Sequence, residues 1–337
     1  MNPTDPKDRI EQRVEELLSQ LTLKEKVALL SGRDSWHTMP LDRLGIPPLM
    51  VTDGPHGVRS NDPRGGRDVG PATSFPTGVS MAASWDPELI ERIGAALAEE
   101  TRAFGGDILL GPCVNIVRTP LAGRNFETYG EDPYLSGRIG TAWVRGLQAR
   151  GVGASLKHFA CNNQETERFR GNSALDERTL REIYLPQFEM VVKEADPWTV
   201  MCAYNRINGE YASQHRRLLT DILKKEWGYR GAVISDWGAT HTIFESVAGG
   251  LDLEMPGPAR YFGRLLEEAV ERWQIDEADV TEAARRMLRL VVRSGRLDAP
   301  EASAGAVNTP EHRALALELA EASITLLKNE HDVLPLT

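Results

Sequence analysis

Short apolar runs alternate with longer amphipathic stretches along most of the chain. Apolar runs of this length predict buried strands at 49–52, 79–83, 108–115, 153–158, 199–204, 232–235 and 251–254. The stretches between them predict helices at 86–104, 134–149, 176–194, 215–227, 240–248 and 260–272. Within 176–194 one apolar stripe recurs at helical spacing, formed by Leu180, Ile183, Tyr184, Phe188 and Val191.

Repeated alternation of strand and helix is typical of parallel βαβ units, and the count and length here favour a closed barrel over an open, doubly wound sheet. No G-x-G-x-x-G follows the first predicted strand, which further disfavours a dinucleotide-binding sheet. The predicted fold class is therefore α/β, a (β/α)8, TIM-barrel-like domain with room for an incomplete or irregular first unit.

The two ends of the chain depart from this alternation. Residues 8–31 predict two short helices, with Thr22 and Glu25 placed as a capping box. Residues 276–295 and 310–327 predict two more helices, joined by a linker rich in Ala, Ser, Pro and Gly. We therefore predict a barrel catalytic domain with N-terminal helices at 1–296, a linker and helix at 297–323, and at 324–337 the start of a second α/β domain that is missing from this chain.

Charge and composition exclude several classes of protein. The 337 residues include 39 Lys plus Arg and 49 Asp plus Glu, a net charge of −10, whereas a nucleic-acid binder needs a basic face. No apolar run approaches the roughly 20 residues of a membrane helix. The N-terminus has no signal-peptide pattern and the three cysteines lie far apart, so we expect reduced thiols and a cytoplasmic location.

The histidines and cysteines do not have the spacing of metal ligands. The sequence contains no H-x-H, H-E-x-x-H or C-x-x-C, and neither a P-loop nor G-x-S-x-G is present. We therefore predict no metal ion and no cofactor.

Polar residues gather directly after the predicted strands. In a parallel barrel the carboxyl ends of the strands meet at one rim, which is where active sites lie. The residues expected to meet there are Asp53, Arg124, Lys157, His158, Tyr204, Asp236 and Trp237.

This mixture of carboxylates, cations, hydroxyl and aromatic groups suits a sugar. Cleavage of a glycosidic bond needs one ionised carboxylate beside the anomeric carbon and one proton donor near the leaving oxygen. Asp236 is the best candidate for the nucleophile because it ends a strand whose rigid backbone can aim it, and Trp237 can wall the sugar site. Lys157, Arg124 and the Tyr204 hydroxyl are expected to keep Asp236 ionised.

Each of these residues alone has an ordinary structural explanation. An aspartate such as Asp236 often only caps the next helix, Trp237 would pack in the core, and a lone His158 would be a hydrogen-bonded structural group. Glu127 is expected to brace a loop or face solvent. Schiff-base chemistry at Lys157 is an alternative, but it needs a desolvated amine, and the neighbouring residues indicate a polar pocket. The convergence of several strand ends favours the catalytic interpretation.

Motifs follow one another in order along nearly the whole chain. They are TDGPxGVR (52–59), GRNxE (123–127), GEDP (130–133), KHF (157–159) with Asn162 and Glu165, MxxYNxxNG (201–209), WGYxG (227–231) and VISDWG (233–238). Each motif alone is unspecific, but their combination resembles glycoside hydrolase family 3, the β-glucosidase family. LLKN (326–329) with LPL (334–336) is similar to that family's entry into its second domain.

The resemblance implies a barrel-like first domain, a retaining mechanism and a β-linked sugar, most often glucose. By motif position it makes Asp236 the nucleophile, gives Tyr204 the role of supporting it, and sets Trp237 at the boundary with the leaving group. The residues implied to bind hydroxyls of the released sugar are Asp53, Arg124, Lys157 and His158.

Two departures from the family pattern matter. The N-acetylhexosaminidase branch has Pro-Gly after Lys-His-Phe and a His-Asp pair in that loop; here the loop continues ACNN (160–163), which disfavours that branch. The β-glucosidase branch takes its proton-donating Glu from the second domain, so no acid/base residue is assigned. We predict a retaining exo-β-glycosidase that acts on a small carbohydrate or β-glycoside, completed by a second α/β domain on the same or a separate chain. The alternative is a catalytically incomplete, carbohydrate-binding barrel.

Overall fold

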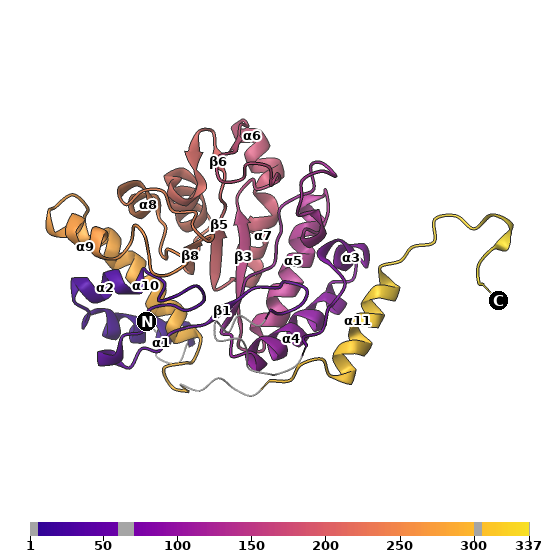
Figure 1. Cartoon of the computed structure of the whole chain (residues 1–337), viewed down its shortest axis with the longest axis horizontal. Coiled ribbons are helices and arrows are strands. Elements are labelled where there is room, and N and C mark those ends of the chain that lie inside the picture. Colours follow the sequence, from indigo (N-terminus) through magenta and orange to yellow (C-terminus); the bar gives the residue numbers. More distant parts are fainter. Residues whose placement is uncertain (1–5, 60–70, 300–304, 337) are drawn as a thin grey trace.

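The computed structural model describes residues 6–59, 71–299 and 305–336. A parallel sheet lies at the centre, with helices on its outside (Figure 1). Its strands run in the order β1 (Val51–Thr52), β2 (Ile108–Leu109), β3 (Gly153–Phe159), β5 (Thr199–Cys202) and β8 (Ala232–Ser235). All residues of these strands are buried, which explains their largely apolar composition.

Short segments close this sheet into a ring. The bridged pairs are Ile234–Leu253, Glu254–Ser31, Gly32–Thr38 and His37–Met50, and Met50 directly precedes β1. The last two bridges are antiparallel. Bends at 33–36 join the first two segments, and a loop that contains the 3-10 turn η1 (Asp42–Leu44) leads from the second segment to Met50. The predicted barrel-like α/β fold is confirmed, and its irregular unit lies at the start of the barrel.

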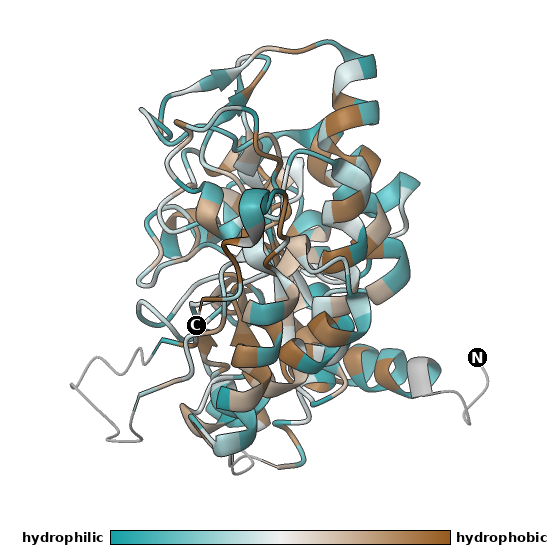
Figure 2. Ribbon diagram, turned by 90° about the vertical axis from the view of Figure 1, so that its right-hand side faces the viewer, coloured by the Kyte–Doolittle hydropathy of each residue, from teal (hydrophilic) through white to brown (hydrophobic). Residues whose placement is uncertain are grey.

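Helices cover the outside of the ring. They are α1 (Pro6–Leu18), α2 (Leu23–Leu29), α4 (Pro87–Ala103), α5 (Pro133–Gln148), α7 (Pro186–Ala195), α8 (Phe244–Gly249), α9 (Arg264–Glu271) and α10 (Glu277–Arg293). Figure 2 shows hydrophobic and hydrophilic residues alternating along the helices, as expected for helices with one face on a core. Thr22 and Glu25 form the predicted capping box, and Asp86 caps α4 through the N–H groups of Glu88 and Leu89.

A small second sheet braces the loops that follow β3 and β5. It consists of β4 (Asn172–Ser173), β6 (Arg206–Ile207) and β7 (Glu210–Tyr211), and β6 lies beyond the end of β5 in Figure 1. These loops carry part of the polar rim.

The prediction of a strand at 79–83 is wrong. These residues belong to helix α3 (Gly78–Ala83), which packs against the 3-10 turn η2 (Asn125–Glu127). Met and Ala are good helix formers, and a short apolar run does not distinguish a buried strand from a buried helical turn.

The helix predicted at 176–194 is interrupted. It consists of α6 (Glu177–Thr179), the π turn η3 (Leu180–Tyr184) and α7, which begins at Pro186. Proline has no N–H and its ring obstructs the preceding turn, so one continuous helix cannot pass through this position undisturbed. The helix predicted at 215–227 is a π-helix, η5 (Arg217–Glu226).

The last described part of the chain leaves the barrel. Helix α11 (Pro310–Ala322) packs on α3 and α4, and the following residues extend away from them (Figure 1). Residues 324–337, predicted to begin a second α/β domain, form no strand over the described residues to 336, where a 3-10 turn, η6 (Glu330–Asp332), is the regular element. Apolar side chains there, such as Leu327 and Leu336, are exposed, because the described chain offers this segment no strand to pair with. The division into domains stays a prediction.

Within the described ranges, no helix has both the length and the apolar composition needed to cross a bilayer.

A buried ion pair holds the last segment of the ring. Asp252 Oδ1 lies 2.7 Å from Lys224 Nζ, its other oxygen accepts from Val233 N at 2.7 Å, and the Asp252 side chain is 2% exposed. Replacing Asp252 with Ala leaves a buried ammonium uncompensated, so we expect a loss of about 3–5 kcal/mol in the free energy of unfolding, measured by urea titration. Asp221→Ala removes the exposed Lys225–Asp221 pair and should cost no more than about 1 kcal/mol. Equal effects of the two substitutions would contradict this account.

Candidate active site

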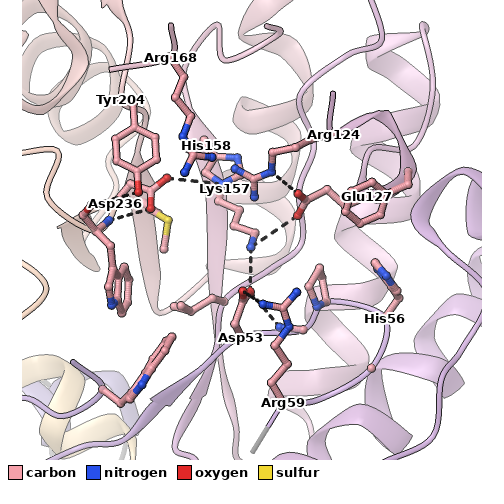
Figure 3. A pocket seen from close by; sticks show the side chains of 18 residues that line it. Asp53, His56, Arg59, Arg124, Glu127, Lys157, His158, Arg168, Tyr204 and Asp236 are labelled. Carbon is pink, nitrogen blue, oxygen red and sulfur yellow. Dashed lines mark hydrogen bonds and ion pairs between the residues drawn. The ribbon is translucent and has the colours of Figure 1, made fainter. Parts of the chain in front are cut away.

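A pocket of about 380 Å³ opens at the carboxyl ends of the strands. Figure 3 shows its side chains converging from separate strand ends and loops. Asp53 follows β1, Arg124 and Glu127 lie in the loop after β2, and Asp236 follows β8. Lys157 belongs to β3, so its side chain rises from the ring itself.

The Lys157 ammonium lies between two carboxylates. Its Nζ is 3.2 Å from Asp53 Oδ1 and 3.6 Å from Glu127 Oε2, and its side chain is 4% exposed. Burial lowers the pKa of Lys157, but the two carboxylates outweigh burial and the net pKa is raised. Lys157 is therefore a cation that binds, and not the neutral amine that Schiff-base chemistry needs.

The same contacts fix the charge of both carboxylates. Burial raises the pKa of Asp53, but Lys157 and the Gly54 N–H outweigh it and the pKa is lowered. Burial likewise raises the pKa of Glu127, but Lys157 and Arg124, whose Nε donates to Glu127 Oε1, bring it below its usual range. Neither group holds a proton at neutral pH.

Asp236 has a different environment. Its Oδ1 accepts from the Trp237 N–H at 2.7 Å, while Oδ2 accepts no hydrogen bond and lies 3.7 Å from His158 Nε2. Burial raises the pKa of Asp236, and the Trp237 N–H, the Tyr204 hydroxyl, Lys157 and Arg124 only partly oppose this, so the net pKa is raised. The groups expected to keep Asp236 ionised act in the expected direction, but burial is stronger.

His158 is held by Asn115. The Asn115 Oδ1 accepts from the His158 backbone N–H at 2.8 Å, and Asn115 Nδ2 donates to the His158 carbonyl at 2.9 Å. Burial, with help from Arg124 and Lys157, lowers the pKa of His158 well below its usual value. The imidazole beside Asp236 is therefore neutral at pH 7.

Aromatic side chains form the wall beside Asp236. The Trp237 ring lies 5.3 Å from that of Trp36, and its Nε1 donates to Ser35 O at 2.9 Å. The Tyr204 hydroxyl donates to Trp237 O at 3.1 Å, and the Arg168 guanidinium lies 4.6 Å from the centre of the Tyr204 ring. These contacts hold Trp237 and Tyr204 in place on either side of the carboxyl group.

The structure brings all seven residues predicted from the sequence to this pocket: Asp53, Arg124, Lys157, His158, Tyr204, Asp236 and Trp237. Glu127, expected to brace a loop or face solvent, does not face solvent: its side chain is 5% exposed, and it pairs with Arg124 in its own loop and with Lys157. Sequence reasoning also missed Trp36, His56, Arg59 and Arg168, which line the pocket. His56 and Arg59 share a motif with Asp53, and Arg168 lies in the loop after β3 together with Asn162 and Glu165, so all three had a usable signal. Trp36 comes from a segment that only the tertiary fold brings here.

The pocket is lined by charged donors and acceptors together with aromatic rings, a combination that recognises a polyhydroxylated ring. In the described part of the chain, no group of three or more His, Cys, Asp or Glu side chains has the geometry of a metal site.

Comparison with known proteins agrees with this geometry. A family model described as the glycosyl hydrolase family 3 N terminal domain matches residues 15–290. The chain belongs to glycosyl hydrolase family 3. The family predicted from the motifs is confirmed.

Relatives in family 3 match nearly all of this chain. Thermostable beta-glucosidase B of Acetivibrio thermocellus is 48% identical over 329 residues, which are 96% of this chain and 43% of that protein. An exo-alpha-(1->6)-L-arabinopyranosidase of Bifidobacterium longum is 45% identical, over 95% of this chain and 42% of that protein. Beta-glucosidase 3B from Thermotoga neapolitana in complex with glucose superposes with a TM-score of 0.91 at 40% identity, over 96% of this chain and 48% of that chain. The chain thus spans less than half the length of each of these family 3 proteins.

The charge balance around Lys157 makes a testable prediction. Glu127→Gln removes one of the two carboxylates that raise the pKa of Lys157, so the ammonium should lose its proton at lower pH. Acetylation of Lys157 by acetic anhydride, followed by mass spectrometry across a pH series, should then begin at lower pH than in the wild type. Glu131→Gln, in an exposed side chain of the same loop, is the matched control and should leave the profile unchanged. An unshifted profile in Glu127→Gln would count against the pairing.

Proposed function

We propose that this chain is the nucleophile-bearing part of a retaining exo-β-glycosidase of the β-glucosidase type. The observation that carries the proposal is the difference between the pocket carboxyl groups. Asp53 and Glu127 are paired with Lys157, whereas Asp236 has an oxygen without a hydrogen bond, opposite that cluster. One carboxylate is thereby left to react while the others bind.

In the proposed reaction, Asp53, Arg124, Lys157 and His158 hold hydroxyls of the terminal sugar. A carboxylate oxygen of Asp236 attacks the anomeric carbon as the bond to the leaving oxygen breaks, and a glycosyl-enzyme ester forms. Water then attacks the same carbon from the opposite face and releases Asp236, so the configuration of the sugar is retained. The Trp237 ring forms the wall on the leaving-group side.

We propose that the proton for the leaving oxygen comes from a second α/β domain, on the same or a separate chain. Asp53 and Glu127 have lowered pKa values and His158 is neutral, so these pocket residues are poor acids at neutral pH. The length of the relatives supports this, since the matched part is 43% of the A. thermocellus protein and 48% of the T. neapolitana chain.

Glucose is the first sugar we propose, supported by the names of the relatives and by the glucose complex of the T. neapolitana enzyme. The similar exo-alpha-(1->6)-L-arabinopyranosidase of B. longum makes an arabinopyranoside the second sugar to test. We also propose a cytoplasmic location, on the separate ground that Cys113, Cys161 and Cys202 are buried free thiols.

A second candidate function is that of a barrel that binds a sugar but does not hydrolyse a glycoside. It is supported by the length of the relatives, since this chain covers less than half of each and no proton donor is assigned within it. The two candidate functions differ in whether the chain breaks the glycosidic bond of a bound sugar.

Removal of the nucleophile separates them. Asp236→Gly should lower the hydrolysis of 4-nitrophenyl β-glucoside by more than about 10³-fold, the scale on which hydrolases lose activity with their nucleophile. Added azide should restore nitrophenol release and give the α-glycosyl azide, because it attacks from the side that the carboxylate vacated. Asp176→Gly, at an exposed helix cap, is the control. A β-azide, or hydrolysis unaffected by the substitution, would refute the assignment; glucose binding without hydrolysis by the wild type would favour the second candidate.

The raised pKa of Asp236 is expected to determine the pH at which kcat/KM falls on the acid side. Because Asp236 reacts as the carboxylate, kcat/KM should fall as pH drops through this raised pKa. Tyr204→Phe removes a hydroxyl that lowers the pKa, so the pKa should rise further and the acid limb should move to higher pH. Tyr211→Phe, outside the pocket, should leave the limb in place. A limb that moves to lower pH in Tyr204→Phe would contradict this prediction.

A further inference from the structure

A fully buried carboxyl group lies behind the pocket, outside the proposed machinery. Glu100 on α4 has no exposed surface. Its Oε1 accepts from Thr73 Oγ1 at 2.6 Å, from Asn308 N at 2.9 Å and from His312 Nδ1 at 2.9 Å, while Oε2 accepts from Thr73 N at 2.9 Å. The donors come from two segments that lie far apart in the sequence.

The first segment supports a wall of the sugar pocket. The N–H of Phe75, two residues after Thr73, donates to His56 O at 2.9 Å. A Cβ at Gly57 would lie only 3.2 Å from Thr73 O, so the two backbones are in close contact there. His56 and Gly57 line the pocket beside Asp53. Thr73 and Phe75 therefore back the loop after β1, which carries six of the residues that line the pocket.

The second segment is the start of α11. His312 is 5% exposed, and its Nε2 lies 3.3 Å from Glu99 Oε2 while its Nδ1 faces Glu100. Leu315 and Leu319 are also buried and form the apolar face of α11. Glu100 adds polar contacts to these apolar ones at the same junction.

A buried carboxylate is tolerated only when its hydrogen bonds are made. Glu100 is fully satisfied only with both segments in place, since each supplies two of its four donors. Displacing α11 leaves two acceptor sites empty and weakens the hold on Thr73. The carboxylate therefore links the position of α11 to the position of the His56 loop.

We infer that Glu100 is a positioning residue for the sugar pocket, which couples the docking of α11 to the wall formed by His56 and Gly57. This inference rests on the proposed function for its effect on sugar binding, although the coupling itself does not. Asp236 lies on the opposite wall, so the effect should fall on sugar binding and not on the chemical step.

The test compares three variants with one matched control in the full chain. Glu100→Gln replaces one acceptor oxygen with an NH2 donor, and Thr73→Val removes one donor on the pocket side. His312→Gln removes one donor on the α11 side together with the ring that lies 6.4 Å from the Phe75 ring. The control, Glu318→Gln, breaks an exposed contact between α11 and α4, the pair of Glu318 with Arg92 at 2.6 Å. It leaves Glu100 and its donors untouched.

Three readouts distinguish positioning from general stability. Glucose affinity by calorimetry should weaken about threefold to tenfold in Glu100→Gln and Thr73→Val, the range expected from losing a net hydrogen-bond contribution. With 4-nitrophenyl β-glucoside, KM should rise while kcat stays near the wild-type value. Hydrogen exchange of the Phe75 amide should speed up in all three variants, including His312→Gln, whose polar side-chain contacts are with Glu99 and Glu100 on α4. Glu318→Gln should match the wild type in each measurement.

The outcomes separate the inference from the proposed function. A wild-type chain that binds no glucose counts against the proposed function, and hydrogen exchange then still decides the coupling. If Glu100→Gln does not fold, Thr73→Val and His312→Gln carry the test. Variants that melt at lower temperature, but keep wild-type KM and wild-type exchange at Phe75, would overturn the inference and leave Glu100 a purely structural residue.

Discussion

A lysine ammonium buried at the mouth of the barrel constrains the groups around it. Lys157 rises from β3 with almost no contact with water, so opposite charges must meet it from neighbouring elements. Asp53 after β1 and Glu127 after β2 do so, which ties the ends of β1, β2 and β3 together. The charges of these two carboxylates are therefore compensated by ion pairs with Lys157. Asp236, on the far side of the pocket, is left as a buried carboxyl group with a raised pKa and an oxygen that accepts no hydrogen bond.

The difference between the paired carboxylates and Asp236 explains how one pocket can both hold a sugar and react with it. Groups locked in ion pairs have fixed charge and orientation, which suits them to hold hydroxyl groups without changing protonation during a reaction. A group that is buried but incompletely paired is at higher free energy as an anion, and it gains most when it forms a bond to a cationic centre. The fold supplies the rigidity for both, because Lys157 and Asp236 come from or directly follow buried strands.

The sequence predicted the parallel alternation and the site residues that end strands, since both follow from local pattern and from the geometry of a parallel barrel. Asp53, Lys157, Tyr204 and Asp236 belong to this group. It did not predict Trp36, whose segment approaches the pocket only through tertiary packing, and it did not predict that Glu127 pairs with Lys157, which comes from another strand. The strand predicted at 79–83 failed for a related reason: a short apolar run reports burial, but not which kind of element is buried.

The account depends most on the claim that Asp236 is the group that bonds to the sugar. Incubation with 2,4-dinitrophenyl 2-deoxy-2-fluoro-β-glucoside tests this directly, because the activated leaving group needs no proton donor and the fluorine slows release of the ester. Peptide mapping by mass spectrometry should find one fluoroglucosyl unit, attached to Asp236. A label on Glu127 or on any other carboxyl group would contradict the account, as would an unlabelled chain that binds glucose.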